Sequence, residues 1–126
     1  MQRRFLLPAA IFGFLGVAMG AFGAHGLKHL LNDYQLEIYK TAVSYQMWHA
    51  LLLGLVAVLP ERKLLCWAGW ALITGIVLFS GSLYLLAISG LRWLGMVTPL
   101  GGVGFLLAWA LLAWTAYQQS KENSHG

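Results

Sequence analysis

The chain has 126 residues, of which 60% are hydrophobic and only 10% carry a charge. A soluble domain carries about 25% charged residues, so this chain holds too few polar groups to cover a globule in water. Its net charge of +4 is spread along the sequence and forms no basic stripe, which argues against nucleic acid as a partner. The composition excludes an ordinary soluble domain and predicts a single membrane domain over residues 1–126.

The charged residues divide the sequence into four long apolar runs. No Asp, Glu, Lys or Arg occurs in Phe5–Leu27, Thr41–Pro60, Leu64–Leu91 or Trp93–Ser120. A helix needs about 20 apolar residues to cross a hydrocarbon core of about 30 Å, and every run reaches that length. We therefore expect an all-α integral membrane protein, a four-helix bundle with spans at about 5–24, 41–59, 64–89 and 98–117.

The first run carries a stripe of glycines, Gly13, Gly16, Gly20 and Gly23, spaced so that they share one helical face. Such faces allow membrane helices to pack closely, so we expect a partner helix against this stripe. Two arginines, an apolar run and small residues up to Ala24 also resemble a secretory signal peptide. The run is longer than the apolar region of a typical signal, so we expect a retained helix; cleavage would leave three spans.

A short amphipathic segment at the membrane interface is expected before the second span. Its apolar and polar side chains lie on opposite helical faces: Leu27, Leu30, Leu31, Tyr34 and Ile38 against His29, Asp33, Glu37 and Lys40. Asn32 and Gln35 have the spacing of a capping box. The second helix should therefore begin near Asp33 and end at Leu59, before Pro60.

The remaining two helices also have recognisable ends. Glu61–Lys63 forms a short turn into the third helix, and Gly90 is expected as its C-cap. Thr98 and Pro99 are typical of a helix start, with a hydroxyl N-cap followed by proline. Late aromatic residues are expected to approach the far membrane interface: Trp109, Trp114 and Tyr117. The polar tail, residues 118–126, is expected to be disordered.

Counting Lys and Arg predicts the orientation of the chain. The side of the membrane that holds both termini carries five such residues and the other side three: Arg3, Arg4, Arg62, Lys63 and Lys121 against Lys28, Lys40 and Arg92. Positive residues are retained on the cytoplasmic side, so we expect both termini in the cytoplasm.

Polar residues in the second span mark the candidate site. His49 lies nine residues beyond Lys40, which is about 13 Å along a helix and well inside the membrane. Tyr45 and Gln46 precede it by one turn, and polar side chains at this depth usually face the bundle interior. In one interpretation a neutral His49 joins helices by hydrogen bonds to Tyr45, Gln46 or a hydroxyl of Ser80 or Ser82. In the other, His49 takes part in ligand, proton or ion binding.

The sequence offers little for a metal or for catalysis. His25 and His29 are four residues apart, a spacing found in zinc-binding helices, but no third ligand follows nearby. They remain weak candidates, and a metal or redox site joining them with His49 is a third, weaker hypothesis. The single cysteine, Cys66, excludes an intramolecular disulfide. No span contains a carboxylate, no nucleophile lies beside a base, and we expect neither a cofactor nor an enzyme.

Four motifs, in order, resemble the YgdD-like family of small four-span inner-membrane proteins (domain of unknown function 423). They are Gly20–Lys28 (GAFGAHGLK), Thr41–His49 (TAVSYQMWH), Phe79–Leu85 (FSGSLYL) and Gly95–Gly102 (GMVTPLGG). The resemblance covers nearly the whole chain. It implies a four-helix membrane fold and, for a bacterial protein, the cytoplasmic membrane. It transfers no activity and assigns no residue a role.

Two functions follow as hypotheses. Packing stripes are abundant and reactive groups are scarce, which favours a non-enzymatic bundle that binds a partner protein, a lipid or a small hydrophobic molecule. The alternative is a subunit of a small oligomeric transporter or channel, with the polar face around His49 lining a path. Beyond the lipid bilayer, the candidate partners are further copies of the chain or another membrane protein.

Overall fold

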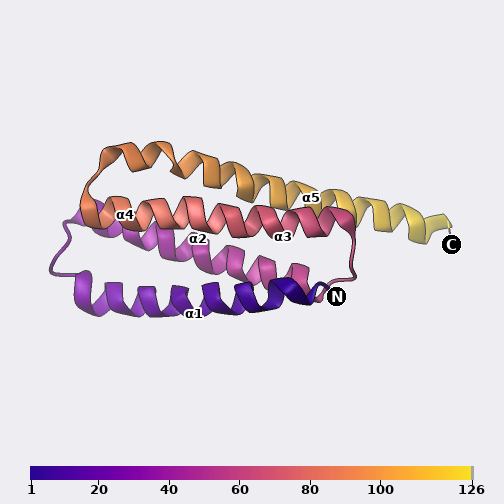
Figure 1. Ribbon diagram of the computed structural model, residues 1–126, viewed down its shortest axis with the longest axis horizontal. Helices are drawn as coiled ribbons and strands as arrows, with labels where there is room; N and C mark the ends of the chain where they lie inside the picture. The colour runs from indigo at the N-terminus through magenta and orange to yellow at the C-terminus, as the bar shows by residue number, and fades with distance from the viewer. Residues whose placement is uncertain (126) are drawn as a thin grey trace.

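The computed structural model describes residues 1–125 and consists of four antiparallel helical rods (Figure 1). The first rod is a 3-10 turn at Arg3–Phe5, helix α1 at Leu6–Phe22 and a π-helical turn at Gly23–Leu27; the second is α2 at Asp33–Val58. The third rod consists of α3 at Lys63–Gly75, a π-helical turn at Ile76–Ser80 and α4 at Gly81–Ser89. The fourth rod is a 3-10 turn at Arg92–Met96 followed by α5 at Thr98–His125. The described residues contain no strand.

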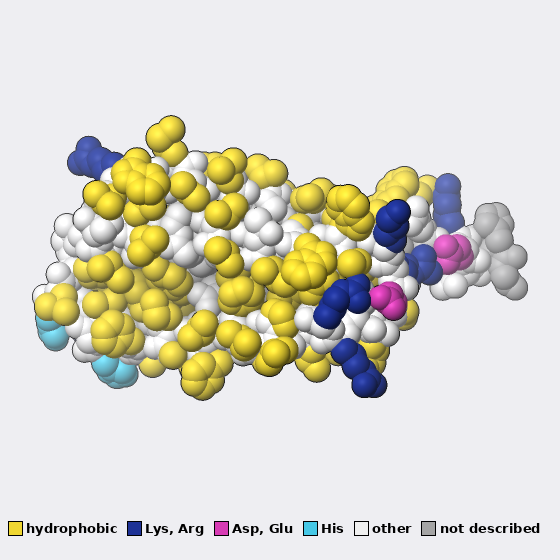
Figure 2. Space-filling model, viewed as in Figure 1, with side chains coloured by type: hydrophobic (Ala, Val, Ile, Leu, Met, Phe, Trp, Pro, Cys, Tyr) yellow, Lys and Arg dark blue, Asp and Glu magenta, His cyan; other side chains and the backbone are white. Residues whose placement is uncertain are grey.

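All four rods are long and apolar enough to cross a membrane, with mean hydropathies of 2.1, 1.4, 2.1 and 1.8 in chain order. The protein is therefore an all-α membrane bundle, as the sequence predicts. Figure 1 shows both termini at the same end of the bundle. Hydrophobic side chains cover the surface between the two ends, whereas Lys and Arg side chains gather at the end of the termini (Figure 2).

The four rods are not equivalent, because α2 and the α3–α4 rod form the centre of the bundle. Helix α1 packs mainly on α2, and α5 packs mainly on α3 and the π turn that follows it. In their most apolar stretches the two central rods have 44% and 39% of residues buried, whereas the outer two have 17% each. One face of α1 and one of α5 are consequently left for lipid.

Several local predictions are confirmed. Asn32 and Gln35 form the capping box: the Gln35 N–H donates to Asn32 Oδ1 at 2.8 Å, and the Asn32 N–H donates to Gln35 Oε1 at 3.1 Å. Gly90 is the C-cap of α4 with a φ of 73°, a left-handed conformation that favours glycine. The amphipathic segment expected before α2 is different: residues 28–30 form a turn and Leu31 a bend, so they are not helical, while Leu27 packs in a small cluster with Tyr39 and Ala87.

Other local predictions are wrong in whole or in part. Helix α5 begins at Thr98, as predicted, but the Thr98 hydroxyl contacts Ser82 and the carbonyl of Leu94 instead of capping a helix N–H. The polar tail is not disordered over its described length, because α5 continues to His125. Arg62 contacts this extension, as its guanidinium donates to Glu122 Oε2 at 2.9 Å, and this hydrogen bond raises the pKa of Arg62.

Close packing explains most of the glycine stripes. A Cβ atom on Gly16 or Gly23 would collide with Met47 or Tyr39 of α2, but one on Gly13 would meet nothing within 4 Å. The predicted stripe therefore contacts α2 over three of its four members and not at Gly13. Between α3 and α5, a Cβ on Gly104 would lie 3.0 Å from the carbonyl oxygen of Ala71, so the two backbones are almost in contact.

Candidate functional site

His49 occupies a closed position between α2 and α5. Only 5% of the residue is exposed, and its ring stacks on Phe105 with centroids 3.6 Å apart and planes 9° apart. Its Nδ1 lies 2.7 Å from the carbonyl oxygen of Tyr45, one turn earlier. Its Nε2 accepts a hydrogen bond of 3.2 Å from the indole N–H of Trp109 on α5. This position therefore joins two helices through stacking and hydrogen bonding.

The hydrogen-bond partners define the protonation of the His49 ring. An indole N–H can only donate, so Nε2 must carry the lone pair and Nδ1 the proton. The Nδ1–H then donates to Tyr45, whose carbonyl can only accept. A neutral His49 with both nitrogens engaged fits this arrangement, and neither nitrogen is left for a metal or a second proton.

Gln46 belongs to a different network, on the side of α2 that faces α1 and α4. Its Nε2 donates to the carbonyl oxygen of Phe12 at 2.8 Å, and its Oε1 accepts from the hydroxyl of Tyr84 at 2.7 Å. Only 4% of Gln46 is exposed. The Gln46 amide therefore connects α2 to two neighbouring rods. Burying it in hydrocarbon costs little free energy, because both its nitrogen and its oxygen are hydrogen-bonded.

Ser80 and Ser82 lie in and just after the π-helical turn Ile76–Ser80 and are both buried. The Ser80 hydroxyl donates to the carbonyl oxygen of Ala42 at 2.8 Å, which joins the turn to α2. Ser82 Oγ lies 2.6 Å from Thr98 Oγ1 and also donates to the carbonyl of Phe79. Neither hydroxyl contacts His49. The predicted polar patch is thus divided into four separate sets of contacts, around His49, around Gln46, around Ser80 and around Ser82.

An aromatic groove of about 780 Å³ runs beside His49, between α2 and α5. Its walls are Tyr45, Trp48, His49, Leu51, Phe79, Pro99, Gly102, Val103, Phe105, Leu106 and Trp109. The rings of Tyr45 and Phe79 are 4.6 Å apart, and those of Tyr45 and Trp48 are 5.1 Å apart. The hydroxyl of Tyr45 makes no hydrogen bond with another described residue. The groove therefore offers aromatic surface together with a free polar group.

Sequence reasoning identified Tyr45 and His49 in this groove but missed Phe79, Phe105 and Trp109. We expected Trp109 near the far interface, whereas it lies at the depth of His49. No sequence signal separates these aromatic residues from the others that face lipid. Their contribution depends on how α5 and the π turn are rotated toward α2.

The two histidines proposed as weak metal ligands are not part of this site. His25 and His29 are exposed at the other end of α1 and in the following turn. Within residues 1–125, no group of three or more His, Cys, Asp or Glu side chains could hold a metal ion. His49 does not contact these two histidines, since its hydrogen-bond partners are Tyr45 and Trp109.

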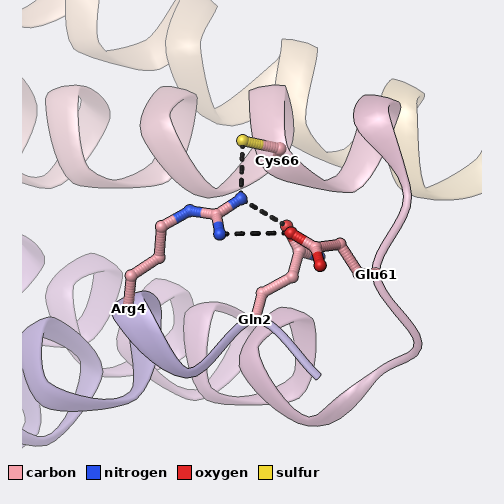
Figure 3. A network of polar contacts seen from close by, with 4 residues as sticks. All are labelled: Gln2, Arg4, Glu61 and Cys66. Atoms are coloured by element: carbon pink, nitrogen blue, oxygen red, sulfur yellow. Dashed lines mark hydrogen bonds and ion pairs between the residues drawn. The ribbon is translucent and has the colours of Figure 1, made fainter.

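A second polar cluster lies at the end that holds the termini (Figure 3). The Arg4 guanidinium extends from the first turn toward α3 and contacts Glu61 Oε1 at 3.2 Å, Cys66 Sγ at 2.9 Å and Gln2 Oε1 at 3.4 Å. The backbone N–H of Gln2 donates to the carbonyl of Ala57 at 2.9 Å. These contacts attach the start of the chain to the α2–α3 turn.

Comparisons with known proteins extend these observations. A family model described as "Protein of unknown function (DUF423)" matches residues 19–102. The Bacillus subtilis UPF0382 membrane protein YwdK is 44% identical over 116 residues, which cover 89% of this chain and 94% of YwdK. The Escherichia coli UPF0382 inner membrane protein YgdD is 47% identical over 116 residues, which cover 89% of this chain and 88% of YgdD.

A Staphylococcus aureus relative, UPF0382 membrane protein SAB0533, is 40% identical over 113 residues, which cover 88% of this chain and 93% of the relative. No solved structure matches the chain significantly. The relatives are membrane proteins, in agreement with the four apolar rods. Since the family model matches most of the chain and the relatives align over nearly all of it, this chain belongs to the DUF423 family of membrane proteins, whose function is unknown.

Proposed function

We propose that this membrane protein binds a small, bilayer-soluble molecule with a flat ring system in the groove between α2 and α5, without chemical turnover. The observation that carries the proposal is the aromatic lining of this groove beside His49. Ligand sites in proteins are commonly clefts of about 300–1,000 Å³ with apolar walls and few polar groups. At about 780 Å³, this groove is of that size.

The groove supports recognition of a ring system with one hydrogen-bonding group. The rings of Tyr45, His49 and Phe105 are nearly parallel, with interplanar angles of 14° and 9° between successive rings. These three rings stack on one another, and the exposed rings beside them, those of Trp48 and Trp109, are 57% and 48% exposed and favour offset stacking with a further aromatic ring. The Tyr45 hydroxyl is free to donate to, or accept from, a polar group on the ligand.

Binding has more support than turnover or transport. Catalysis by His49 would need a free nitrogen, and both nitrogens are engaged by Tyr45 and Trp109. A transport path along the His49 face would need that face to be open to water, but Phe105 and Trp109 cover it. The transporter alternative would thus require α5 to move away from α2.

We also propose the orientation that the distribution of Lys and Arg favours, with both termini in the cytoplasm. The groove is open toward the bilayer, so a ligand dissolved in the membrane would reach it laterally. One chain is enough to form the groove, and a homo-oligomer is not required for binding.

The experiment compares two leucine variants that fill different grooves. Gly102 lines the α2–α5 groove, and a Cβ there would meet only Phe79, at 3.9 Å, so Gly102→Leu should fold. Gly13→Leu is the matched control, because Gly13 also has free space but lines a groove between α1 and α2. Apolar compounds that co-purify with each protein from its native membrane are quantified by mass spectrometry.

We expect an aromatic compound that co-purifies with the wild type and with Gly13→Leu but is reduced at least about tenfold with Gly102→Leu, since losing about 1.4 kcal/mol of contact weakens binding tenfold. Equal recovery from all three proteins would contradict the proposal. So would recovery of phospholipids alone, because the groove would then be an ordinary lipid-facing surface.

A further inference from the structure

A second groove, of about 860 Å³, runs along the outer seam of α1 and α2. Its lining is entirely apolar: Leu6, Ala9, Ala10, Gly13, Phe14, Val17, Ala18, Met47, Ala50, Leu51, Gly54, Leu55 and Val58. Ala9 and Ala50 are buried and lie at its base, and around Gly13 there is open space. Larger side chains such as Phe14 form its edges. The groove thus has the shape of an apolar channel open to the bilayer.

The length of this groove corresponds to one leaflet of a membrane. On α1 it extends from Leu6 to Ala18, and twelve steps of 1.5 Å along a helix are about 18 Å. Half of a hydrocarbon core is about 15 Å. An acyl chain occupies one leaflet, so it matches the groove in length.

The groove opens at the positively charged end of the bundle. That end carries five Lys and Arg residues and two carboxylates, a net charge of +3: Arg3, Arg4, Arg62, Lys63 and Lys121 against Glu61 and Glu122. Figure 2 shows Lys and Arg side chains concentrated there. The opposite end has three cations, Lys28, Lys40 and Arg92, and two carboxylates, Asp33 and Glu37, a net charge of +1.

Arg3 is the cation best placed at the mouth of the groove. Arg4 and Arg62 are already paired with Glu61 and Glu122. Arg3 is exposed, is paired with neither carboxylate, and precedes the first groove residue, Leu6, by about one helical turn. A cation one turn outside an apolar channel is where the phosphate of a lipid would lie when its acyl chain fills the channel.

We propose that the α1–α2 groove is a binding site for an anionic phospholipid, with an acyl chain along Ala10, Gly13 and Gly54 and the headgroup phosphate at Arg3. This site is separate from the aromatic groove and does not depend on a ligand there. Its specificity resides in the headgroup, because the lining residues of the channel are apolar and offer no polar side chain to a ligand.

The test is native mass spectrometry of the purified full chain in detergent, with equimolar phosphatidylglycerol and phosphatidylcholine that share the same acyl chains. A basic residue near an anionic membrane surface contributes enough free energy for a preference of about fivefold. The wild type should therefore retain phosphatidylglycerol about fivefold over phosphatidylcholine. Equal retention of the two lipids by the wild type would overturn the proposal.

Variants separate the headgroup contact from the channel. Arg3→Gln should abolish the preference but keep total lipid binding, whereas Gly13→Leu should lower the binding of both lipids. Arg92→Gln, at the other end of the bundle, is the matched control and should keep the wild-type lipid preference, and Gly102→Leu, in the other groove, should retain both phospholipids as the wild type does. If Gly13→Leu does not fold, Ala10→Leu replaces it, since Ala10 is exposed in the same channel.

Three outcomes of these variants contradict the site. The first is an undiminished preference in Arg3→Gln, and the second is undiminished lipid binding in Gly13→Leu and Ala10→Leu. The third is a wild-type dimer that becomes a monomer in Gly13→Leu without any change in lipid binding, which would make this face an interface between two copies. Loss of the aromatic ligand in Gly102→Leu concerns only the other groove, so the two proposals fail independently.

Discussion

The indole N–H of Trp109 donates to Nε2 of His49 across 3.2 Å, and this bond joins residues sixty positions apart in the sequence. It crosses from α5, an outer helix, to α2, a central one. Because the described contacts occupy both nitrogens of His49, the bond also determines which nitrogen carries the proton. The candidate site is therefore held by a polar contact that stabilises the bundle as well.

Replacing either partner of this bond should destabilise the bundle. His49→Phe leaves the Trp109 N–H without an acceptor, and Trp109→Phe removes the donor; each should cost about 1–2 kcal/mol in unfolding free energy. His49→Gln should retain most of the stability, since an amide oxygen can still accept. The double variant should cost about 0.5–1.5 kcal/mol less than the sum of the single variants, because the two share one bond.

The measurement is reversible unfolding in mixed detergent micelles, followed by circular dichroism. Trp114→Phe is the control: within residues 1–125 the Trp114 ring pairs with one aromatic ring, that of Tyr117, at a tilt of 31°, so this variant should have little effect. Strict additivity of His49→Phe and Trp109→Phe would show that the bond contributes nothing.

Adjacent glycines on α5 should respond in opposite ways to alanine. A Cβ on Gly101 would lie 2.8 Å from the Cα of Phe79, a backbone atom that cannot move alone, whereas one on Gly102 would lie 3.9 Å from Phe79 Cδ2. Gly101→Ala should cost about 1–3 kcal/mol through overpacking. Gly102→Ala should be neutral or slightly stabilising, since alanine is the better helix former. Equal unfolding free energies for the two variants would mean that the packing of α5 against the π turn Ile76–Ser80 tolerates a wider separation.

The C-terminal extension of α5 should depend on a local ion pair. Arg62 and Glu122 are in contact in an exposed setting, so Glu122→Gln should leave the midpoint of global unfolding unchanged. Amide exchange after residue 118 should nevertheless become faster, because the last turns lose their tie to the α2–α3 turn. Glu37→Gln provides the control at the other end of the bundle. Unchanged exchange at residues 119–124 would show that the tail is helical without the pair.

Reporter fusions test the orientation. We expect a fluorescent protein fused after Gly126 to fluoresce, and alkaline phosphatase fused at the same position to remain inactive, because both termini should lie in the cytoplasm. A phosphatase inserted after Gly90 should be active. The reverse pattern would show that the Lys and Arg difference between the two sides is too small to orient the chain.

The sequence by itself determined the four rods and several of their ends. Charge-free runs predict spans because a bilayer excludes charge over a known thickness, and this holds whatever the helices pack against. The Asn32–Gln35 box and the Gly90 cap depend on neighbours within a few residues, so they too could be predicted. The start of α5 at Thr98 was predicted as well, but its hydroxyl contacts Ser82 on another helix instead of capping α5, and no local pattern indicates that contact.

Only the tertiary structure decided what the polar and aromatic side chains do. In a span that is apolar on every side, composition does not determine the rotation of the helix about its axis, because lipid and protein interior are equally apolar. That rotation brings Trp109 to His49 and turns Gln46 away toward Phe12 and Tyr84. The π turn at Ile76–Ser80 changes the rotation of the third rod and places Phe79 in the groove. These rotations determine which polar and aromatic side chains meet across helices. The rotations themselves depend on close backbone contacts between helices, which cannot be read from the sequence of one helix.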